Sequence, residues 1–129
     1  MVVNDELDLV RLLKLTLESK GFRVNIFTDA NIALEHFRNK VSSLRPHPYD
    51  LLVLDIKMPK MDGFELYNEI KKHDSTVKVC FMTALAGLNE YTQYKEQVSP
   101  LLGQRHFVQK PVRSEELLQR INSLMSWKG

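Results

Sequence analysis

The sequence predicts a doubly wound α/β domain, in which a parallel sheet lies between two layers of helices. The first observation is a wholly apolar run, Leu51-Leu52-Val53-Leu54, of the kind that forms a strand buried on both faces of a parallel sheet. The second is a regular alternation of strand-like and helix-like segments along the chain. The third is length, since 129 residues fit one domain, 1–129, with an ordinary core.

The alternation predicts five strands, each followed by a helix. The predicted strands, which are rich in β-branched and other apolar residues, cover 2–3, 22–27, 51–54, 77–82 and 106–109. The helices are predicted from apolar residues at helical spacing, with these examples in chain order: Leu13 and Leu17, Leu34 and Phe37, Phe64 and Tyr67, Tyr91 and Tyr94, Leu117 and Ile121. Right-handed crossovers between parallel strands then place helices on both faces of the sheet.

Helix caps and breakers give the predicted elements their ends. Asp29 and Ser114 are residue types that cap helix N-termini, and Lys20-Gly21 is a typical helix stop. The prolines in 41–48 and the composition of 99–104 indicate two extended loops.

Composition excludes several classes of protein. With 18 Lys and Arg against 16 Asp and Glu, the charge is close to neutral, and no dense basic patch with aromatic residues indicates nucleic-acid binding. No apolar segment approaches the roughly 20 residues of a membrane span, and the start lacks an export signal, so we expect a cytoplasmic protein with no membrane partner. Cys80, the single cysteine, lies in a predicted strand and is expected to be a buried, inert thiol.

Polar residues follow four of the predicted strands. They are Asn4 and Asp5, then Asp55, Thr83 and Lys110. Because the carboxyl ends of parallel strands meet at one edge of such a sheet, we expect these side chains to converge there. Two carboxylates in one place repel unless a cation intervenes, and hard oxygen ligands favour Mg²⁺. The four histidines lack metal-ligand spacing, so zinc is not expected. We expect the histidines to be solvated or hydrogen-bonded at the surface.

This set of residues has the parts needed for phosphoryl transfer to a carboxylate. Asp55 would be the nucleophile, Lys110 would pair with a phosphoryl oxygen, and Thr83 would hydrogen-bond another. Taken one at a time, each residue has an ordinary explanation as a turn, a cap or a solvated side chain. Their joint position at successive strand ends favours the chemical interpretation.

At these residues the chain resembles the receiver domain of two-component response regulators, over nearly its whole length. The segments that carry the resemblance are Asn4-Asp5-Glu6, Asp55 with Met58-Pro59 and Met61-Asp62-Gly63, Thr83-Ala84, and Lys110-Pro111. The resemblance implies a flavodoxin-like (βα)5 fold with strand order 2-1-3-4-5. It also implies that Asp5 and Asp55 bind Mg²⁺ together with the backbone carbonyl of Lys57, and that Lys110-Pro111 is cis.

The resemblance further implies a role in phosphorelay signalling. A histidine kinase, a phosphotransfer protein or a small phosphodonor would phosphorylate Asp55, and Thr83 and an inward turn of Phe107 would alter a face that binds an output protein or domain. An ordinary core role for Phe107 is an equal alternative. Tyr91 and Tyr94 could be anchors on that face, and core packing is an equal alternative for them as well. A homodimer that forms on phosphorylation is left open.

One residue departs from the family pattern within the metal pocket. Asn4 stands where the family usually has an acid, which removes a negative charge, although an amide oxygen can still hold a metal-bound water. We therefore expect weaker Mg²⁺ binding rather than its loss.

Two other functions fit parts of the sequence. A Mg²⁺-dependent phosphohydrolase also phosphorylates an Asp at a strand end, but it places a second Asp two residues later, where this chain has Lys57. A receiver-like interaction module that is never phosphorylated is the other alternative, and Asn4 is the residue that favours it.

Overall fold

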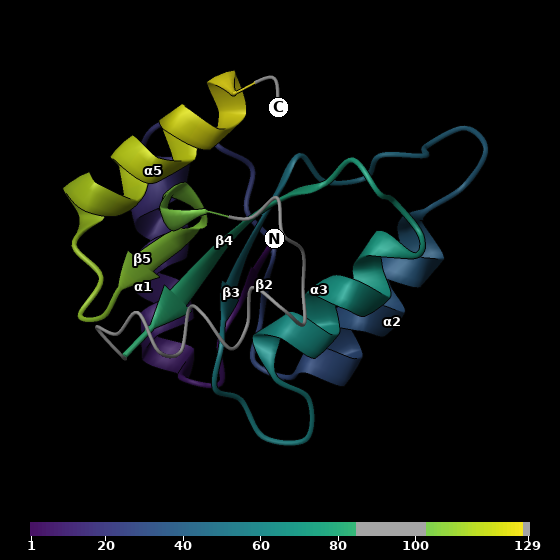
Figure 1. Cartoon of the computed structure of the whole chain (residues 1–129), viewed down its shortest axis with the longest axis horizontal. Helices are drawn as coiled ribbons and strands as arrows, with labels where there is room; N and C mark the ends of the chain where they lie inside the picture. The colour runs from purple at the N-terminus through teal and green to yellow at the C-terminus, as the bar shows by residue number, and fades with distance from the viewer. Residues whose placement is uncertain (85–102, 128–129) are drawn as a thin grey trace.

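The computed structural model describes residues 1–84 and 103–127, and it shows a parallel sheet with helices on both faces (Figure 1). Five strands lie in the order β2-β1-β3-β4-β5, and every neighbouring pair is parallel. The strands are β1 (Val2–Val3), β2 (Ile26–Phe27), β3 (Leu51–Asp55), β4 (Lys78–Thr83) and β5 (Phe107–Gln109). The predicted fold class and strand order are thus confirmed.

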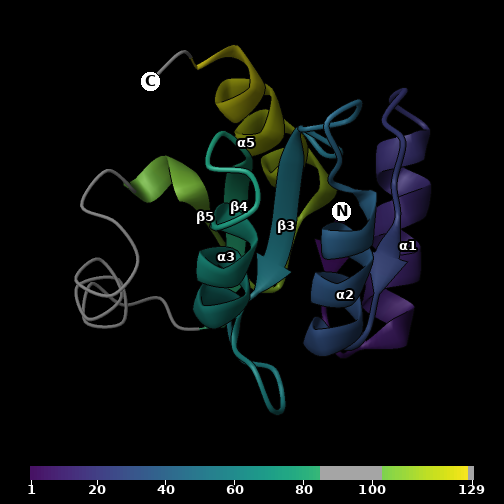
Figure 2. The same cartoon turned by 90° about the vertical axis from the view of Figure 1, so that its right-hand side faces the viewer.

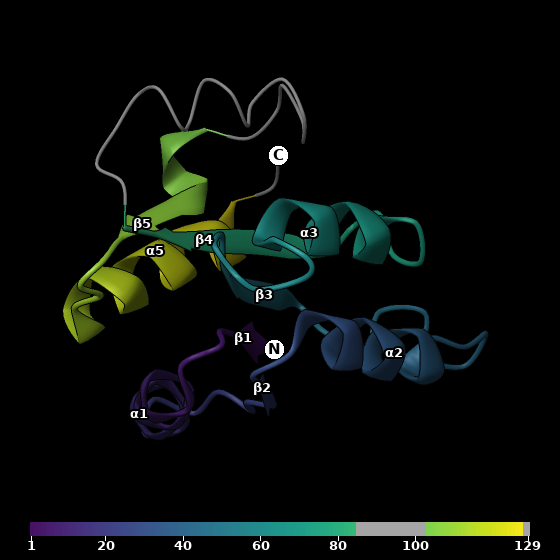
Figure 3. The ribbon, with the colours of Figure 1, turned by 90° about the horizontal axis from the view of Figure 1, so that it is seen from below.

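Four α-helices cover the sheet in the described part of the chain. They are α1 (Leu7–Glu18), α2 (Ala30–Lys40), α3 (Gly63–Lys71) and α5 (Ser114–Ser126). Helices α1 and α5 pack on one face of the sheet, and α2 and α3 pack on the other (Figures 2 and 3). The fourth predicted helix, with Tyr91 and Tyr94, lies outside the described residues.

Alternation along β3 and β4 divides the interior into two cores. Leu52 and Leu54 point to the face under α2 and α3, whereas Val53 points to the face under α1 and α5. In β4, Phe81 belongs to the first core, and Cys80 belongs to the second. A strand buried on both faces must be apolar throughout, which is why the 51–54 run identified β3 from the sequence.

The predicted caps are partly right. The Asp29 carboxylate accepts hydrogen bonds from the backbone N–H groups of Asn31 (2.8 Å) and Ile32 (3.1 Å), as expected of an N-cap. Ser114 is not a cap, because Arg113 occupies the N-cap position of α5 without a side-chain hydrogen bond and Ser114 is the first helical residue. An N-cap needs extended backbone, and here that falls one residue earlier.

Several predicted boundaries also move. Strand β2 has two residues rather than the six expected from 22–27, because in this sheet only Ile26 and Phe27 pair with β1. A 3₁₀ helix at Gln104–His106 replaces the end of the predicted loop and the first residue of the predicted fifth strand. Residues 41–50 form an irregular connection, as the prolines predict. No helix among the described residues is both long and apolar enough to cross a membrane.

Two further features fix elements within the fold. Cys80 is buried, as predicted, and burial raises the pKa of its thiol to about 12, so it stays protonated and inert. The ammonium group of Lys78 donates hydrogen bonds to three carbonyls at the end of α5, those of Leu124 (2.7 Å), Met125 (3.3 Å) and Trp127 (2.7 Å). A cation at a helix C-terminus satisfies the last carbonyls and opposes the helix dipole.

Gly63 lets α3 begin directly against the end of β3. Its backbone N–H donates to the Ile56 carbonyl at 2.8 Å, and a β-carbon at this position would lie 2.3 Å from the backbone oxygen of Asp55. The side chain of Asp62, one residue earlier, caps the helix in a capping box with Glu65. The turn therefore has no room for a side chain at residue 63.

We expect Gly63→Ala to lower the free energy of unfolding by about 1–3 kcal/mol, because the added methyl group forces the backbone of residues 55 and 63 apart. Urea denaturation followed by circular dichroism measures this change. Gly103→Ala is the matched control, since a β-carbon there meets no atom of the described residues within 4 Å. Equal effects of the two substitutions would contradict the steric argument.

Candidate functional site

A hollow of about 230 Å³ lies at the carboxyl edge of the sheet, where four strands end close together. Its lining residues follow β1, β3, β4 and β5 or end them: Asp5, Glu6, Asp55, Ile56, Lys57, Thr83, Ala84 and Lys110. Five of the six predicted site residues therefore share this hollow. The sequence analysis did not assign a role to Glu6, Ile56 or Ala84, and adjacency to the motif residues is the only signal that marks them.

Asp55 is the buried acid at the centre of this hollow. Its side chain is 4% exposed, and one of its oxygens lies 3.0 Å from the ammonium nitrogen of Lys110. Burial raises the pKa of the Asp55 carboxyl, and the hydrogen bond and charge of Lys110 oppose that rise. The negative charge of Asp5 raises the same pKa further. The carboxylate is thus held in a site where its charge costs free energy and a cation is favoured.

The sheet fixes the backbone of Lys110. Its backbone N–H donates to the carbonyl of Thr83 at 2.7 Å, which brings the ends of β4 and β5 together. The Lys110-Pro111 peptide bond is cis, as the family resemblance implies. Thr83 ends β4 half-buried at the wall of the hollow, so Thr83 and Lys110 line the same space from neighbouring strands.

The turn after β3 presents Lys57 to the hollow. The Ile56 N–H donates to the Met82 carbonyl at 3.1 Å, and the Ile56 carbonyl accepts from Gly63, so residue 56 is fixed on both sides. Lys60 adopts the left-handed conformation, with a φ of 70°, within this turn. These contacts hold the backbone of residues 56–63 in a compact loop beside the Asp55 carboxylate.

Asn4 lies apart from the other predicted site residues. It is fully buried, and it is absent from the lining of the hollow. Its side-chain oxygen accepts a hydrogen bond from the backbone N–H of Glu6 at 2.8 Å, and its amide nitrogen has no hydrogen-bond partner among the residues that the structure describes. In this arrangement Asn4 shapes the turn that carries Asp5, whereas a ligand role would need its oxygen to face the hollow.

The donor set suits magnesium better than zinc. The carboxylates of Asp5 and Asp55 share the hollow with Lys57, whose backbone carbonyl could supply a third oxygen, and hard oxygen donors suit Mg²⁺, which keeps some of its waters. Among residues 1–84 and 103–127, no three His, Cys, Asp or Glu side chains group as metal ligands. The residues therefore fit the ion that the family resemblance implies.

The histidines are hydrogen-bonded, but not all are at the surface. His36 contacts the Tyr49 hydroxyl, and His47 contacts Asp74. His106 is 3% exposed, so the expectation of surface histidines is wrong for this residue. Its ring accepts a hydrogen bond from the backbone N–H of Gly103 at 3.1 Å, which explains how a polar ring is buried here.

Phe107 lies at the edge of an aromatic cluster in the core under α3. It is half-buried, and its ring centroid lies 5.5 Å from that of Phe81 and 6.3 Å from that of Phe64. The ring is thus packed against the core without being enclosed by it.

Comparison with known proteins defines the class. Residues 1–122 match the response regulator receiver domain family, and the chain belongs to that family. The fold is that of chemotaxis protein CheY4 from Vibrio cholerae, with a TM-score of 0.75 and 20% sequence identity over 95% of this chain and 94% of that one.

Two relatives extend the comparison. The chain is 29% identical to the response regulator SaeR of Staphylococcus aureus over 98% of its own length, and it spans 50% of the length of SaeR. It is 25% identical to CheY of Borrelia burgdorferi, with a TM-score of 0.79 over 98% of this chain and 87% of that one, in a structure described as a CheX-CheY-BeF3-Mg²⁺ complex. The chain is thus a receiver domain of two-component phosphorelay signalling.

Asp55→Asn should raise the free energy of unfolding at pH 7 in the absence of divalent ions. The folded-state pKa of Asp55 is raised, so its protonated form favours folding and this contribution is lost as pH rises through that pKa. The gap between wild type and variant should close as pH falls below the ordinary value of 3.8.

Urea denaturation across pH 3.5–7, a range set around the ordinary carboxyl pKa, measures this gap. Asp8→Asn, which changes an exposed acid on α1, serves as the control and should show a much smaller pH-dependent difference. A gap that stays constant with pH would contradict the assigned burial of the Asp55 charge.

Proposed function

We propose that Asp55 accepts a phosphoryl group in a Mg²⁺-dependent reaction, with a histidine kinase, a phosphotransfer protein or a small phosphodonor as the source. The observation that supports this most strongly is the buried Asp55 carboxylate 3.0 Å from the Lys110 ammonium at the carboxyl edge of the sheet. A carboxylate oxygen of Asp55 would attack phosphorus, and the bond from phosphorus to the donor's nitrogen or oxygen would break. The product is an aspartyl phosphate.

Asp5, Asp55 and the backbone carbonyl of Lys57 would hold the ion, and bound Mg²⁺ would screen the repulsion between the carboxylate and the incoming phosphoryl oxygens. Two side chains, those of Lys110 and Thr83, would contact the phosphoryl group. Lys110 pairs with Asp55 before transfer and has a phosphoryl oxygen as its new partner afterwards. The Thr83 hydroxyl, from the neighbouring strand, would donate to another phosphoryl oxygen.

The same change would carry the signal. When Lys110 and Thr83 reorient toward the phosphoryl group, the ends of β4 and β5 change together, because the Lys110 N–H is bonded to the Thr83 carbonyl. Phe107 lies on β5 and is only half-buried, so an inward turn of its ring would reshape the outer face of β5 and α5. The size of the shift is limited by the difference in free energy of phosphate contacts between the two states.

The partners follow from membership in the family. A histidine kinase or phosphotransfer protein would supply the phosphoryl group, and an output protein or domain would read the changed face. The chain spans half the length of SaeR. We expect the domain to act in the cytoplasm, where response regulators typically work, as a signalling domain rather than a turnover enzyme.

Incubation with Mg²⁺ and acetyl phosphate should add the mass of one phosphoryl group to the intact chain. The Asp55→Asn variant should show no gain, because the nucleophile is gone. Asp50→Asn is the matched control, since Asp50 precedes the same strand at its opposite end and should leave phosphorylation unchanged. Intact-mass spectrometry measures all three proteins.

Lys110→Ala should slow the mass gain by about tenfold to a hundredfold, which corresponds to the loss of a charged hydrogen bond of roughly 1.5–3 kcal/mol. Lys72→Ala, which removes an exposed lysine at the C-terminal end of α3, should leave the rate of mass gain unchanged. No mass gain in the wild-type chain under any Mg²⁺ concentration would instead favour an interaction module that is never phosphorylated.

Asn4→Asp should strengthen Mg²⁺ binding, by about tenfold or less, because it restores a negative charge close to Asp5 and Asp55 without direct metal contact. The wild-type chain should still bind Mg²⁺ at millimolar concentrations, a range typical of weak carboxylate sites. Isothermal titration calorimetry with MgCl₂ measures both affinities. Asn25→Asp, at the opposite edge of the sheet, is the control for added charge, and an equal gain there would contradict the local effect.

A further inference from the structure

The loop between β3 and α3 packs two methionine side chains against the domain. We call residues 57–61 the loop tip, which extends beyond the start of α3 (Figures 1 and 2). Met58 and Met61 both pack against the core under α2 and α3, and both stay partly exposed. In the described part of the chain, no backbone hydrogen bond joins the loop tip to another element. Side-chain contacts therefore hold the loop tip, which carries Lys57 at the wall of the Asp55 hollow.

A long ion pair is the polar side-chain contact of the loop tip among the described residues. The ammonium nitrogen of Lys60 lies 4.0 Å from a carboxylate oxygen of Asp29, and these side chains are 73% and 33% exposed. Exposed pairs of this kind contribute little to stability. The two methionines are therefore the main anchors of the loop tip.

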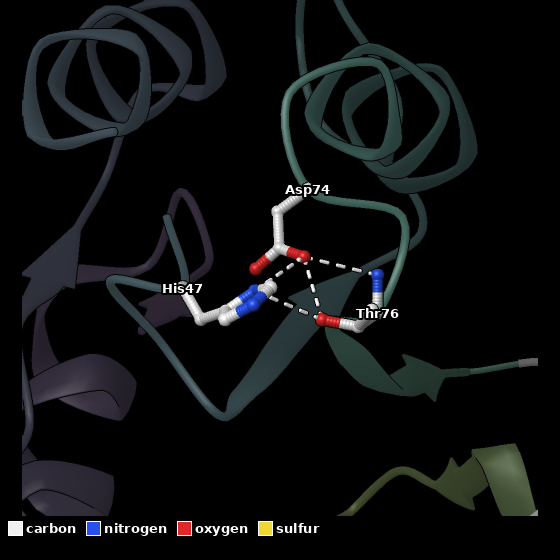
Figure 4. Close-up of polar contacts among 3 residues, drawn as sticks. All are labelled: His47, Asp74 and Thr76. Carbon is white, nitrogen blue, oxygen red and sulfur yellow. Dashed lines mark hydrogen bonds and ion pairs between the residues drawn. The ribbon is translucent and has the colours of Figure 1, made fainter. Parts of the chain in front are cut away.

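The connection 41–50, which also borders this core, has a different kind of anchor. His47 Nδ1 lies 3.0 Å from a carboxylate oxygen of Asp74, and the Thr76 hydroxyl donates to the same oxygen at 2.6 Å (Figure 4). Asp74 is 4% exposed, so buried polar contacts hold this connection. The loop tip lacks such an anchor in the part of the chain that the structure describes, and its position depends on apolar contacts.

Methionine is an apolar anchor that oxidation makes polar. Peroxides convert its thioether to a sulfoxide, and exposed thioethers react most readily. Met58 and Met61 are partly exposed, whereas Met82 in β4 is fully buried and Met125 on α5 is exposed. The buried thiol of Cys80 has a pKa raised to about 12, so it does not compete for the oxidant as a thiolate. The chain thus places its reactive sulfurs beside the phosphorylation site.

We propose that Met58 and Met61 form a redox-sensitive modification site, at which a peroxide loosens the loop tip and slows phosphorylation of Asp55. A sulfur electron pair attacks one peroxide oxygen, a sulfur–oxygen bond forms as the oxygen–oxygen bond breaks, and the second oxygen leaves as water with both protons. Each sulfur is oxidised by two electrons, and the peroxide is reduced. The polar sulfoxide is costly to keep against the core, so the loop tip detaches.

This inference rests on the proposed function, because the backbone carbonyl of Lys57 is one of the oxygens proposed to hold Mg²⁺ beside Asp55. A detached loop tip no longer fixes that carbonyl. Slower phosphorylation then follows from the loss of a positioned oxygen, while Asp55 and Lys110 remain in place on the sheet.

The first test uses hydrogen peroxide on the whole chain without Mg²⁺ or a phosphodonor. Peptide mass spectrometry should show one added oxygen on Met58 and Met61 at rates close to that of Met125, and much slower oxidation of Met82. Amide hydrogen exchange in residues 56–63 should become faster on oxidation, while exchange in β4 stays unchanged. Oxidation of Met82 as fast as that of Met58 and Met61, or unchanged exchange in residues 56–63, would overturn the proposal.

The second test measures the mass gain from acetyl phosphate and Mg²⁺ before and after oxidation. Oxidised chain should react about threefold to tenfold more slowly, the range that corresponds to lost sulfur and apolar contacts. The double variant Met58→Leu, Met61→Leu keeps apolar side chains of similar volume and should be insensitive to peroxide. Met125→Leu, the matched control, should stay as sensitive as the unsubstituted chain.

Reversal gives a check that needs no variant. Methionine sulfoxide reductases should restore both the slow amide exchange of residues 56–63 and the rate of mass gain in the oxidised chain. A rate that stays low after reduction, or equal slowing of the double variant by peroxide, would overturn the proposal. Absence of phosphoryl uptake in the untreated chain would refute the proposed function, whereas uptake that peroxide leaves unchanged would refute this inference alone.

Discussion

The ion pair of Asp55 and Lys110 requires a carboxylate to be removed from water at the end of a buried strand. Burial alone raises the pKa of Asp55, and Lys110 at 3.0 Å offsets part of that cost. A buried acid with one cationic partner is more costly than a solvated acid, so this arrangement contributes little to stability. Its value is chemical, because it favours any additional cation or electrophile that reaches the carboxylate.

The rest of the carboxyl edge keeps this pair in register. The backbone N–H of Lys110 is hydrogen-bonded to Thr83, and Ile56, next to Asp55, is hydrogen-bonded to β4 and to Gly63. The backbones of Asp55 and Lys110 are therefore both held by the sheet. Gly63 allows α3 to start within contact of the Asp55 carbonyl. A one-residue change in the pairing of β4 with β3 or with β5 would turn the side chains to opposite faces and separate the acid from the lysine.

The parts of this structure that sequence predicted are those set by strong local patterns. The apolar run at 51–54 predicted β3 because a doubly covered strand tolerates no polar side chain, and strand alternation predicted the convergence of Asp5, Asp55, Thr83 and Lys110. The position of Asn4 was not predictable, since both a ligand and a turn-forming amide fit its place in the sequence. The hydrogen bonds of Lys78 to the end of α5 and the burial of His106 depend on residues distant in sequence, so no local pattern predicts them. Ser114 failed as a cap because residue type alone does not fix where extended backbone becomes helical.

The two edges of the sheet differ in electrostatic character although they are built on the same strands. At the carboxyl edge, the lining includes three acids, Asp5, Glu6 and Asp55, and two lysines, of which Lys110 pairs with Asp55, so a further cation is favoured there. At the amino edge, the residues around the start of β3 include Arg23, Lys40 and Arg45 and one acid, Asp50. Strand β3 begins beside Asp50 and ends in Asp55, and the apolar interior along it screens charges at the two edges from each other less than water would, because its dielectric constant is low.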